Sequence, residues 1–410
     1  MKISLIEFSV ENFKIFKKKV VFSMFARKSK HTFDNNGENL LKTSLIYGPN
    51  ASGKSTLFQA FALLRNGIIS SANNPEGSIL PYQPFALSPV EDKPVFYEVV
   101  FSMGKKIFKY NFSILKNEIH TENLFEILST KKEKEYLIRK KQNIKVFFDF
   151  KNSQDVAEVK TRKEVLFLSA ASQWNNELAM QIVEGFKNIN VISGPDSENY
   201  RGYTMNLFKT GGGKKDKILD FLKKADFCIE SGSVEKMKLP EFVRKQISIV
   251  GTKDIPNEVD TIFFEHNKFD IKGTKIGTTK FNIGDESAGT QKFFDVLGPI
   301  VDTIENGKVL LVDEFDNSLH PYSYLTKFIL DFFERNNPNN AQLIVTTHDT
   351  SLLSRKEFNK EQFWFTEKDK FGAGNLFSLA EFKTQRNDTE FSQKYLKGRF
   401  GALPFIDSEN

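Results

Sequence analysis

One segment constrains the fold of this chain more than any other, the glycine-rich stretch Gly48-Pro-Asn-Ala-Ser-Gly-Lys-Ser55. It matches the pattern G-x-x-x-x-G-K-[ST] at every fixed position. The short apolar run Ser44–Tyr47 precedes it, and residues 56–64 follow with the apolar spacing of a helix. A strand, a glycine-rich turn and a helix in this order predict a loop whose backbone N–H groups surround a chain of phosphates. The alternative is a glycine turn with a solvated lysine, and the flanking strand and helix argue against it.

Each residue type in this loop has a chemical reason. Gly48 and Gly53 allow the backbone to wrap closely around phosphate oxygens, and Lys54 is expected to reach the β- and γ-phosphates. Ser55 is expected to ligate Mg²⁺ through its hydroxyl. The other residues expected to contact the nucleotide from this stretch are Asn50, Ser52 and Thr56. The loop therefore predicts ATP and Mg²⁺ as cofactors.

The composition excludes several other classes of protein. Of the 410 residues, 40% are hydrophobic and 27% charged, which is typical of a soluble globular chain of two to three domains. The longest apolar runs, such as Val309–Val312, are far shorter than the roughly 18 residues of a membrane span. Glu7 interrupts the region where a secretion signal needs apolar residues. The single cysteine, Cys228, excludes an internal disulfide and a zinc site built on several thiolates. We therefore expect a cytoplasmic protein without membrane contact.

The chain divides into three stretches of different texture. Residues 1–115 are rich in strand patterns, residues 116–280 are polar and poorly periodic, and strands alternate with helices over residues 281–410. Val309–Val312 and Gln342–Thr346 are short and mostly apolar, as in parallel strands that are buried on both faces. These patterns predict an α/β fold in which one sheet is assembled from both ends of the chain, with an insertion between them.

Several shorter patterns refine this organisation. Residues 95–101 and 107–114 predict a hairpin, whereas residues 217–228 predict an amphipathic helix. Gly211-Gly-Gly-Lys-Lys lacks a Ser or Thr after its lysines and predicts a flexible loop. The basic run Lys131–Lys145 predicts a solvated hairpin face, with binding of nucleic-acid phosphates as the alternative. No sustained heptads occur, so a long coiled-coil arm is not expected. The net charge of +6 allows contact with nucleic acid without requiring it.

Two carboxylates follow the strand pattern at residues 309–312. Asp313 is expected to hold Mg²⁺ through water, and Glu314 is expected to act as the general base toward the γ-phosphate. A helix at residues 322–334 leads to the next strand, after which His348 is expected to donate a hydrogen bond to the γ-phosphate. Each residue alone has an ordinary alternative, a solvated acidic turn or a surface histidine. Their positions on adjoining strands favour a shared site.

Taken together, these elements resemble the class of ATP-binding-cassette (ABC) ATPases to which SMC and RecF proteins and the OLD family belong. The resemblance rests on the loop 48–55, Asp313-Glu314, the D-loop-like residues 315–321, His348, the signature-like residues 286–291 and the opening hairpin pattern at 8–16. It implies an ATPase head with two lobes around a mainly parallel sheet, an antiparallel β subdomain and an inserted mixed or helical region.

The resemblance also implies three domains. Residues 1–115 would form an N-terminal lobe with the Walker A loop, and residues 281–410 a C-terminal lobe with the signature, the Walker B strand and His348. Residues 116–280 would be inserted for specificity or partner binding.

The mechanism implied by this resemblance requires two copies of the chain. Two heads would pair head to tail, so that Ser287 and Gly289 of one copy contact the γ-phosphate held by Lys54 of the other. Asp316 would contact the nucleotide, and hydrolysis would loosen the pair. Gln83 is the candidate for the glutamine that contacts Mg²⁺ and water, with an ordinary turn residue as the alternative.

Residues 393–404 and 164–174 are further similar to the stand-alone ATPases of bacterial anti-phage systems, such as RloA, AbiL and the AriA component of PARIS. This resemblance implies a sensor that controls a separate effector chain, for example a TOPRIM-type nuclease, because only 62 residues follow His348. A phage protein or nucleic acid would be the trigger. The alternatives are a RecF- or SMC-like repair ATPase that binds DNA directly, and an oligomer that ATP holds together in a structural role.

Overall fold

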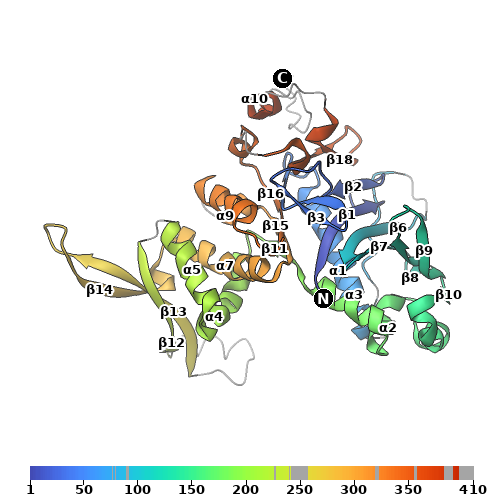
Figure 1. Cartoon of the computed structure of the whole chain (residues 1–410), viewed down its shortest axis with the longest axis horizontal. Coiled ribbons are helices and arrows are strands. Elements are labelled where there is room, and N and C mark those ends of the chain that lie inside the picture. The colour runs from blue at the N-terminus through green and yellow to red at the C-terminus, as the bar shows by residue number, and fades with distance from the viewer. Residues whose placement is uncertain are drawn as a thin grey trace. The chain divides into compact units, whose positions relative to one another are not determined.

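The computed structural model describes residues 1–75, 77–78, 80–88, 92–225, 228–239, 241, 257–318, 323–354, 358–382 and 391–396. The chain forms two compact units, whose elements are labelled in Figure 1. Unit 1 consists of residues 1–194, 303–316 and 326–410, and unit 2 consists of residues 195–302 and 317–325.

A mainly parallel sheet of six strands forms the centre of unit 1, with the order β11-β15-β16-β5-β17-β18. Its strands are β5 (Thr43–Tyr47), β11 (Ile189–Ser193), β15 (Val309–Asp313), β16 (Gln342–Thr346), β17 (Phe363–Lys368) and β18 (Gly374–Ser378). All neighbours pair in parallel except β17 and β18. Because parallel strands end at one edge, the segments that follow β5, β15 and β16 meet there. The expected assembly from both ends of the chain is confirmed.

An antiparallel sheet of seven strands lies in the same unit, with the order β10-β9-β8-β7-β6-β1-β2. Its strands are β1 (Ile3–Glu11), β2 (Val20–Ser23), β6 (Val95–Met103), β7 (Lys106–Leu115), β8 (Glu118–Ile127), β9 (Glu133–Lys140) and β10 (Asn143–Val146). The predicted hairpin is present as β6 and β7. The sheet continues from β7 into β8, so the boundary expected at residue 115 divides a single sheet, and β11 likewise belongs to unit 1.

A buried ion pair explains why the strand pattern of β8 and β9 is hard to read in the sequence. Glu122 and Arg139 are fully buried, and Arg139 Nη1 donates to Glu122 Oε2 over 3.1 Å. The same carboxylate accepts from the Tyr110 hydroxyl (2.8 Å) and from the first two N–H groups of α2 (Phe167–Gln173), at 2.7 and 3.0 Å. Breaking such a pair costs about 3–5 kcal/mol, so charged residues here fix helix α2 to the sheet.

Helix α1 (Lys54–Ser70) and one glutamine connect the two sheets of unit 1. The buried face of α1 packs into a common core with residues of both sheets, including the edge-to-face pair Phe8 and Phe61, whose ring centroids are 5.1 Å apart. The fully buried Gln342 side chain accepts from Leu5 N (2.7 Å) and donates to Leu5 O (3.0 Å). This pair of bonds joins β16 of the parallel sheet to β1 of the antiparallel sheet.

Shorter elements complete unit 1. They are β3 (Thr32–Asn35), β4 (Glu38–Leu41), α3 (Glu177–Lys187), α8 (Phe315–Ser318), α9 (Ser323–Arg335) and α10 (Phe391–Leu396), although the last two residues of α8 and the first residues of α9 belong to unit 2. Helix α9 confirms the helix expected at 322–334. Residues 319–321 of the D-loop-like segment and 397–404 of the tail lie outside the described residues.

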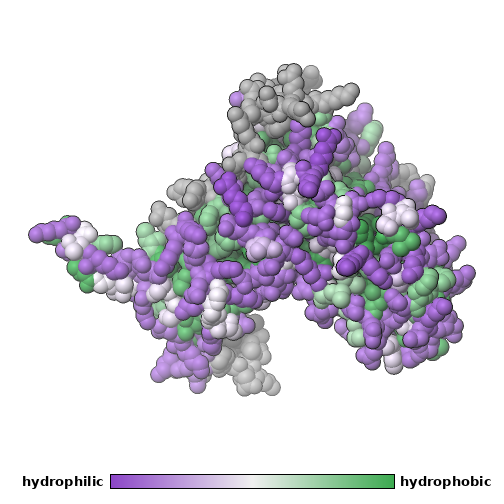
Figure 2. Space-filling model, viewed as in Figure 1, coloured by the Kyte–Doolittle hydropathy of each residue, from purple (hydrophilic) through white to green (hydrophobic). Residues whose placement is uncertain are grey.

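Unit 2 contains the helices α4 (Arg201–Thr210), α5 (Gly213–Lys224) and most of α7 (Ala288–Asn306). Its antiparallel sheet has the order β12-β13-β14, with β12 (Ile229–Lys238), β13 (Glu258–Phe269) and β14 (Lys275–Asn282). Figure 2 shows hydrophilic and apolar side chains mixed along the hairpin of β13 and β14. In the described part of the chain, no helix is both long and apolar enough to cross a membrane.

Two expectations from the sequence differ from the observed structure of unit 2. Gly211 and Gly212 have φ values of +73° and +71° and form a turn, but α5 begins at Gly213. Lys214 and Lys215 are therefore helical and not part of a flexible loop, and the helix expected over residues 217–228 starts earlier and ends at Lys224. Glycine at two consecutive left-handed positions ends α4 and permits α5 to start at once, which explains the difference.

Helix α7 contains a proline, and helix α4 replaces the backbone hydrogen bond that this proline cannot form. Pro299 has no N–H, so it cannot donate to the carbonyl of Asp295 one turn earlier. The buried Thr204 hydroxyl donates to that carbonyl over 2.7 Å and accepts from Gly298 N over 3.1 Å. A Cβ at Gly298 would lie 2.8 Å from Thr204 Cα, so the close approach of the two helices requires glycine. The helix that follows the signature-like segment is thereby locked to α4.

Candidate functional site

The glycine-rich loop 48–53 joins β5 to α1, as its pattern predicts. Gly48 has φ +155° and Gly53 has φ +119°, which side chains other than hydrogen rarely allow. A Cβ at Gly48 would lie 2.6 Å from Ser52 Oγ, and one at Gly53 would lie 2.9 Å from Phe16 Cζ. The loop therefore needs glycine at both positions because of backbone conformation and close neighbours.

Thr366 on β17 supports this loop through a contact with Ser52 that no pattern in the sequence predicts. Its buried hydroxyl lies 2.5 Å from Ser52 Oγ and donates to the Tyr47 carbonyl over 3.3 Å. The contact arises because β17 pairs in parallel with β5, with Phe365 opposite Tyr47. A single threonine more than 300 residues away in the chain carries no motif, so only the strand pairing could have shown it.

The turn between β1 and β2 packs against the other side of the loop. Phe13 and Phe16 form an isolated β-bridge in this turn, and the Phe16 ring is the neighbour of Gly53. The Ile15 carbonyl accepts from Gly374 N at the start of β18 over 2.7 Å. The opening hairpin expected at residues 8–16 is thus present, and its turn lies between the glycine-rich loop and β18.

Lys54 begins α1 with a buried side chain. Its Nζ donates to the carbonyls of Gly48 (2.7 Å) and Pro49 (3.2 Å), so the ammonium lies over the loop. Burial lowers the pKa of Lys54, while the carboxylates Asp313, Glu314 and Asp316 act in the opposite direction. Of the other predicted contacts, Ser55 and Thr56 are half-buried and Asn50 is exposed. The Lys54 ammonium thus lies over its own loop, within electrostatic reach of three carboxylates.

A threonine hydroxyl fixes the acidic pair at the end of β15. Thr346 Oγ1 donates to Asp313 Oδ1 over 2.6 Å and accepts from Glu314 N over 2.7 Å. Glu314 has φ +52°, a left-handed conformation that ends the strand abruptly. Thr346 is fully buried at the end of β16, so its hydroxyl fixes both the Asp313 carboxylate and the backbone of Glu314.

Asp316 and His348 are brought together at the same edge. Asp316 Oδ2 accepts from the backbone N–H of His348 over 3.1 Å. Partial desolvation and the Lys54 ammonium lower the pKa of His348, against the opposing effect of Asp316, Glu314 and Asp313. The imidazole is therefore neutral near pH 7 and carries one N–H that can be donated.

The donor atoms in this region fit a magnesium ion. The Ser55 hydroxyl and the Asp313 carboxylate are hard oxygen ligands, and the buried Asp316 Oδ1 has no hydrogen-bond partner within the described residues. Those residues contain no group of three or more His, Cys, Asp or Glu side chains that could hold a metal by itself. This set suits Mg²⁺, which takes few protein ligands and completes its shell with water and phosphate oxygens.

Gln83 is exposed, and its backbone carbonyl accepts from Lys14 N over 2.9 Å. Its loop is therefore attached to the same turn that packs against Gly53, but no contact within the described residues links its side chain to Asp313 or Ser55. Its role as a magnesium and water contact stays a prediction.

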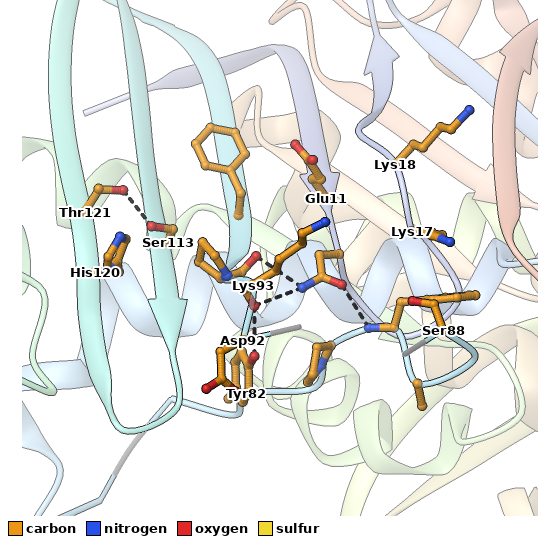
Figure 3. Close-up of a pocket in the computed structure, with 16 residues that line it drawn as sticks. Glu11, Lys17, Lys18, Tyr82, Ser88, Asp92, Lys93, Ser113, His120 and Thr121 are labelled. Atoms are coloured by element: carbon orange, nitrogen blue, oxygen red, sulfur yellow. Dashed lines mark hydrogen bonds between the residues drawn. The ribbon is translucent and has the colours of Figure 1, made fainter. Parts of the chain in front are cut away.

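A cavity of about 930 Å³ lies beside this loop (Figure 3). Its wall is held by Asn12, whose Oδ1 accepts from Phe85 N (3.2 Å) and whose Nδ2 donates to the Lys93 carbonyl (3.0 Å). On the opposite wall, the hydroxyls of Ser113 and Thr121 are 2.6 Å apart across β7 and β8. The cavity is built by the ends of four strands of the antiparallel sheet and by the loop after Tyr82, and it mixes basic and aromatic residues.

The signature-like residues lie in unit 2, at the start of α7. Ser287 is exposed, and its Oγ accepts from Thr290 N over 3.1 Å, as an N-terminal cap does. Gly289 is in the first turn of the helix. Glu286 is held by His266 of β13, whose Nε2 lies 2.7 Å from Glu286 Oε1. A capped start of a long helix with an adjacent glycine can bind an anionic oxygen.

The glycine-rich loop between a buried parallel strand and a helix, together with Asp313 and Glu314 on a nearby strand, defines a P-loop nucleotide-binding protein. A family model described as "AAA domain, putative AbiEii toxin, Type IV TA system" matches residues 44–193 and 220–354, which is more than half of the chain. The chain therefore belongs to this family. No curated protein matches it.

Among solved structures, the chain is similar to heads of SMC proteins. The SMC head domain from Thermotoga maritima is 13% identical, with a TM-score of 0.42, and the match covers 92% of this chain and 99% of that one. The Smc head domain from Pyrococcus furiosus, solved with the C-terminal domain of ScpA, is 12% identical with a TM-score of 0.40 and coverages of 97% and 100%. That from Pyrococcus yayanosii is 10% identical with a TM-score of 0.42 and the same coverages.

Proposed function

We propose that this chain is an ABC-type ATPase that binds ATP with Mg²⁺ and hydrolyses it. The observation that carries the proposal is the cluster of Lys54, Asp313, Glu314, Asp316 and His348 at the edge of the parallel sheet. The electrostatic influence of all three carboxylates on both Lys54 and His348 supports their closeness. Lys54 would bind the β- and γ-phosphates, Glu314 would accept a proton from the attacking water, and His348 would donate its N–H to the γ-phosphate. Mg²⁺ held by Ser55 and Asp313 would neutralise phosphate charge.

We further propose that two copies pair head to tail around two nucleotides. The exposed Ser287 and the adjoining Gly289 would supply a helix N-terminus to the γ-phosphate bound by the other copy. The lock between α4 and α7 supports this role, because it holds the helix behind that N-terminus in one position. Hydrolysis would remove the charge that this surface binds and would loosen the pair.

At the level of biology, we propose a regulatory ATPase of a bacterial anti-phage system that controls a separate effector, for example a TOPRIM-type nuclease. The support is the family, whose description refers to the AbiEii toxin and a type IV toxin–antitoxin system. In that role, paired heads would hold the effector, and a phage protein or nucleic acid would change the ATPase cycle.

The second candidate is a RecF- or SMC-like repair ATPase that grips DNA through the basic run 131–145. The contacts of that run favour the first candidate. Lys131 pairs with Glu38, Lys141 pairs with Glu118 over 2.9 Å, and Lys134 lies 3.9 Å from the ring centroid of Phe148. The run forms β9 and β10, a hairpin whose charges are partly neutralised, as the solvated-face interpretation predicts.

The proposal is tested by measuring phosphate release and molecular mass by light scattering with ATP and Mg²⁺. The wild-type chain should hydrolyse ATP, and Glu314→Gln should accumulate as a pair in ATP. A Ser287→Arg change should prevent pairing while each single head still binds ATP. If Glu314→Gln hydrolyses ATP at the normal rate, the catalytic assignment is wrong, and if Ser287→Arg pairs normally, the head-to-tail arrangement is wrong.

A further inference from the structure

The hairpin of β13 and β14 extends beyond the rest of its sheet. Strand β12 pairs with β13 only as far as His266, whereas Asn267 to Phe269 pair with β14 alone. Figure 1 shows this end of the hairpin free of the other labelled elements of unit 2. The outer part of the hairpin, residues 267–278, is called the tip below. It forms a two-stranded ribbon whose exposed side chains add nothing to the core of unit 2.

The turn of the tip is closed by its one acidic residue. Asp270 Oδ1 accepts from the N–H groups of Lys272 and Thr274, both over 2.8 Å. Asp270 N also donates to the Thr274 carbonyl over 2.9 Å, and Gly273 has φ +79°. The carboxylate is therefore used by the backbone, and the turn has a defined shape.

Three lysines surround this turn without neutralising partners. Lys268, Lys272 and Lys275 are exposed, and none of the three forms an ion pair or a side-chain hydrogen bond within the described part of the chain. By contrast, Lys280 nearer the base pairs with Glu235 over 2.7 Å. Positive charge thus accumulates at the outer end of the ribbon, while the base is neutralised.

Apolar side chains are exposed among these lysines. Ile271 is fully exposed at the turn, and Ile276 and Phe269 have exposed fractions of 58% and 56%. Apolar side chains that are exposed to water do not stabilise the fold. Their burial against a partner would contribute favourable binding free energy. The tip therefore combines unpaired cations with apolar side chains on a ribbon one hairpin wide.

We propose that the tip binds duplex nucleic acid, with the three lysines on backbone phosphates and Ile271 in a groove. A major groove about 12 Å wide admits a two-stranded β-ribbon. Lysine contacts to phosphates provide affinity without sequence preference, and apolar side chains in a groove pack against sugars and base edges. Charge complementarity selects this partner, since all free charge at the tip is positive. The binding does not depend on the ATPase proposed above.

The test is fluorescence anisotropy of a labelled 30-base-pair duplex, titrated with the full chain over a series of salt concentrations. Changing Lys268, Lys272 and Lys275 together to Ala should weaken binding roughly 10- to 100-fold at 0.1 M salt. It should also reduce the slope of log affinity against log salt by about 2 to 3, as loss of three phosphate contacts requires. Ile271→Ser should lower the affinity by a smaller factor and leave that slope unchanged.

A matched control uses three exposed lysines of unit 1 outside the basic run, Lys28, Lys105 and Lys151, which also lack ion pairs within the described residues. Changing these three to Ala removes the same charge and should alter duplex affinity less than twofold. ATP turnover reports that each variant is folded and active.

The proposal is overturned if the tip variant turns over ATP and binds the duplex as the wild type does, or if the control triple loses as much affinity. It is also overturned if the wild type binds phosphatidylserine vesicles and not the duplex. Turnover is measured separately from duplex binding, so none of these outcomes changes the ATPase assignment. If the wild-type chain binds the duplex through the tip but does not hydrolyse ATP, the ATPase assignment is wrong and the tip proposal stands.

Discussion

The nucleotide region of unit 1 and the signature region of unit 2 are built in different ways. In unit 1, hydroxyls from distant strands hold the segments of the candidate site, Thr366 at the glycine-rich loop and Thr346 at the acidic pair. In unit 2, Ser287 caps its own helix and stays exposed, with its neighbour Glu286 held by a histidine of the adjoining hairpin. The first region is preorganised by a buried network. In the second region the start of the helix is exposed, as the head-to-tail pairing proposed above requires.

The difference predicts that substitutions in the two regions separate chemistry from assembly. The sharpest case is Glu314→Gln, because a general base contributes about 10²- to 10⁴-fold to a rate. Turnover should fall by that factor while ATP affinity changes less than threefold, as measured by phosphate release and by titration calorimetry. Glu177→Gln, on the exposed first turn of α3, is the control. An equal loss of turnover in Glu314→Gln and Glu177→Gln would contradict the assignment of Glu314 as the general base.

A second substitution tests the loop itself. Lys54→Ala should weaken ATP binding roughly 10- to 100-fold, since a hydrogen bond to a charged group is worth about 1.5–3 kcal/mol. Lys223→Ala, at an exposed position of α5, should leave the dissociation constant unchanged. An unchanged constant for Lys54→Ala would mean that the buried lysine serves only the carbonyls of its own loop.

A pair of matched threonine substitutions compares the two regions directly. Thr366→Val and Thr204→Val each remove a fully buried hydroxyl that both donates and accepts, and each should lower the free energy of unfolding by about 1–3 kcal/mol. Urea denaturation measures that loss. Only Thr366→Val should also weaken ATP binding, several-fold, because Ser52 loses its partner. Weakened binding in Thr204→Val would show that the two regions are less separate than their contacts indicate.

Much of the nucleotide region could be predicted because its signals are local. The loop 48–55 and the acidic pair each follow directly on a short apolar strand, so one stretch of sequence carries both the strand and the chemistry. The confirmed strands β5 and β16 are buried along their length, and β15 is buried up to Val312, which gives the continuous apolar pattern.

The parts that could not be predicted depend on partners far away in the sequence. Strands β8 and β9 bury Glu122 and Arg139, so an apolar period of two is broken where the ion pair lies. Thr366 reaches the glycine-rich loop because β17 pairs with β5, and the residues next to Thr366 in the sequence do not indicate that pairing. The role of Thr204 becomes clear only from the structure. Pro299 leaves the Asp295 carbonyl without its helical hydrogen bond, and the Thr204 hydroxyl replaces that bond. Buried polar pairs are thus the features for which hydrophobic periodicity gives no signal.

The smallest expected effect concerns the protonation of His348. Its pKa in the folded chain lies below the ordinary value of 6.5, so the unfolded chain binds this proton more readily. The neutral imidazole therefore costs no stability above that value, and the folded state loses stability as the pH falls through and below it. Bound triphosphate adds negative charge and should raise the pKa of His348 back toward or above 6.5. Histidine NMR titrations with and without a non-hydrolysable ATP analogue measure the change, and His348→Ala identifies the resonance among the five histidines. A pKa that does not move with the analogue would place His348 outside the phosphate site.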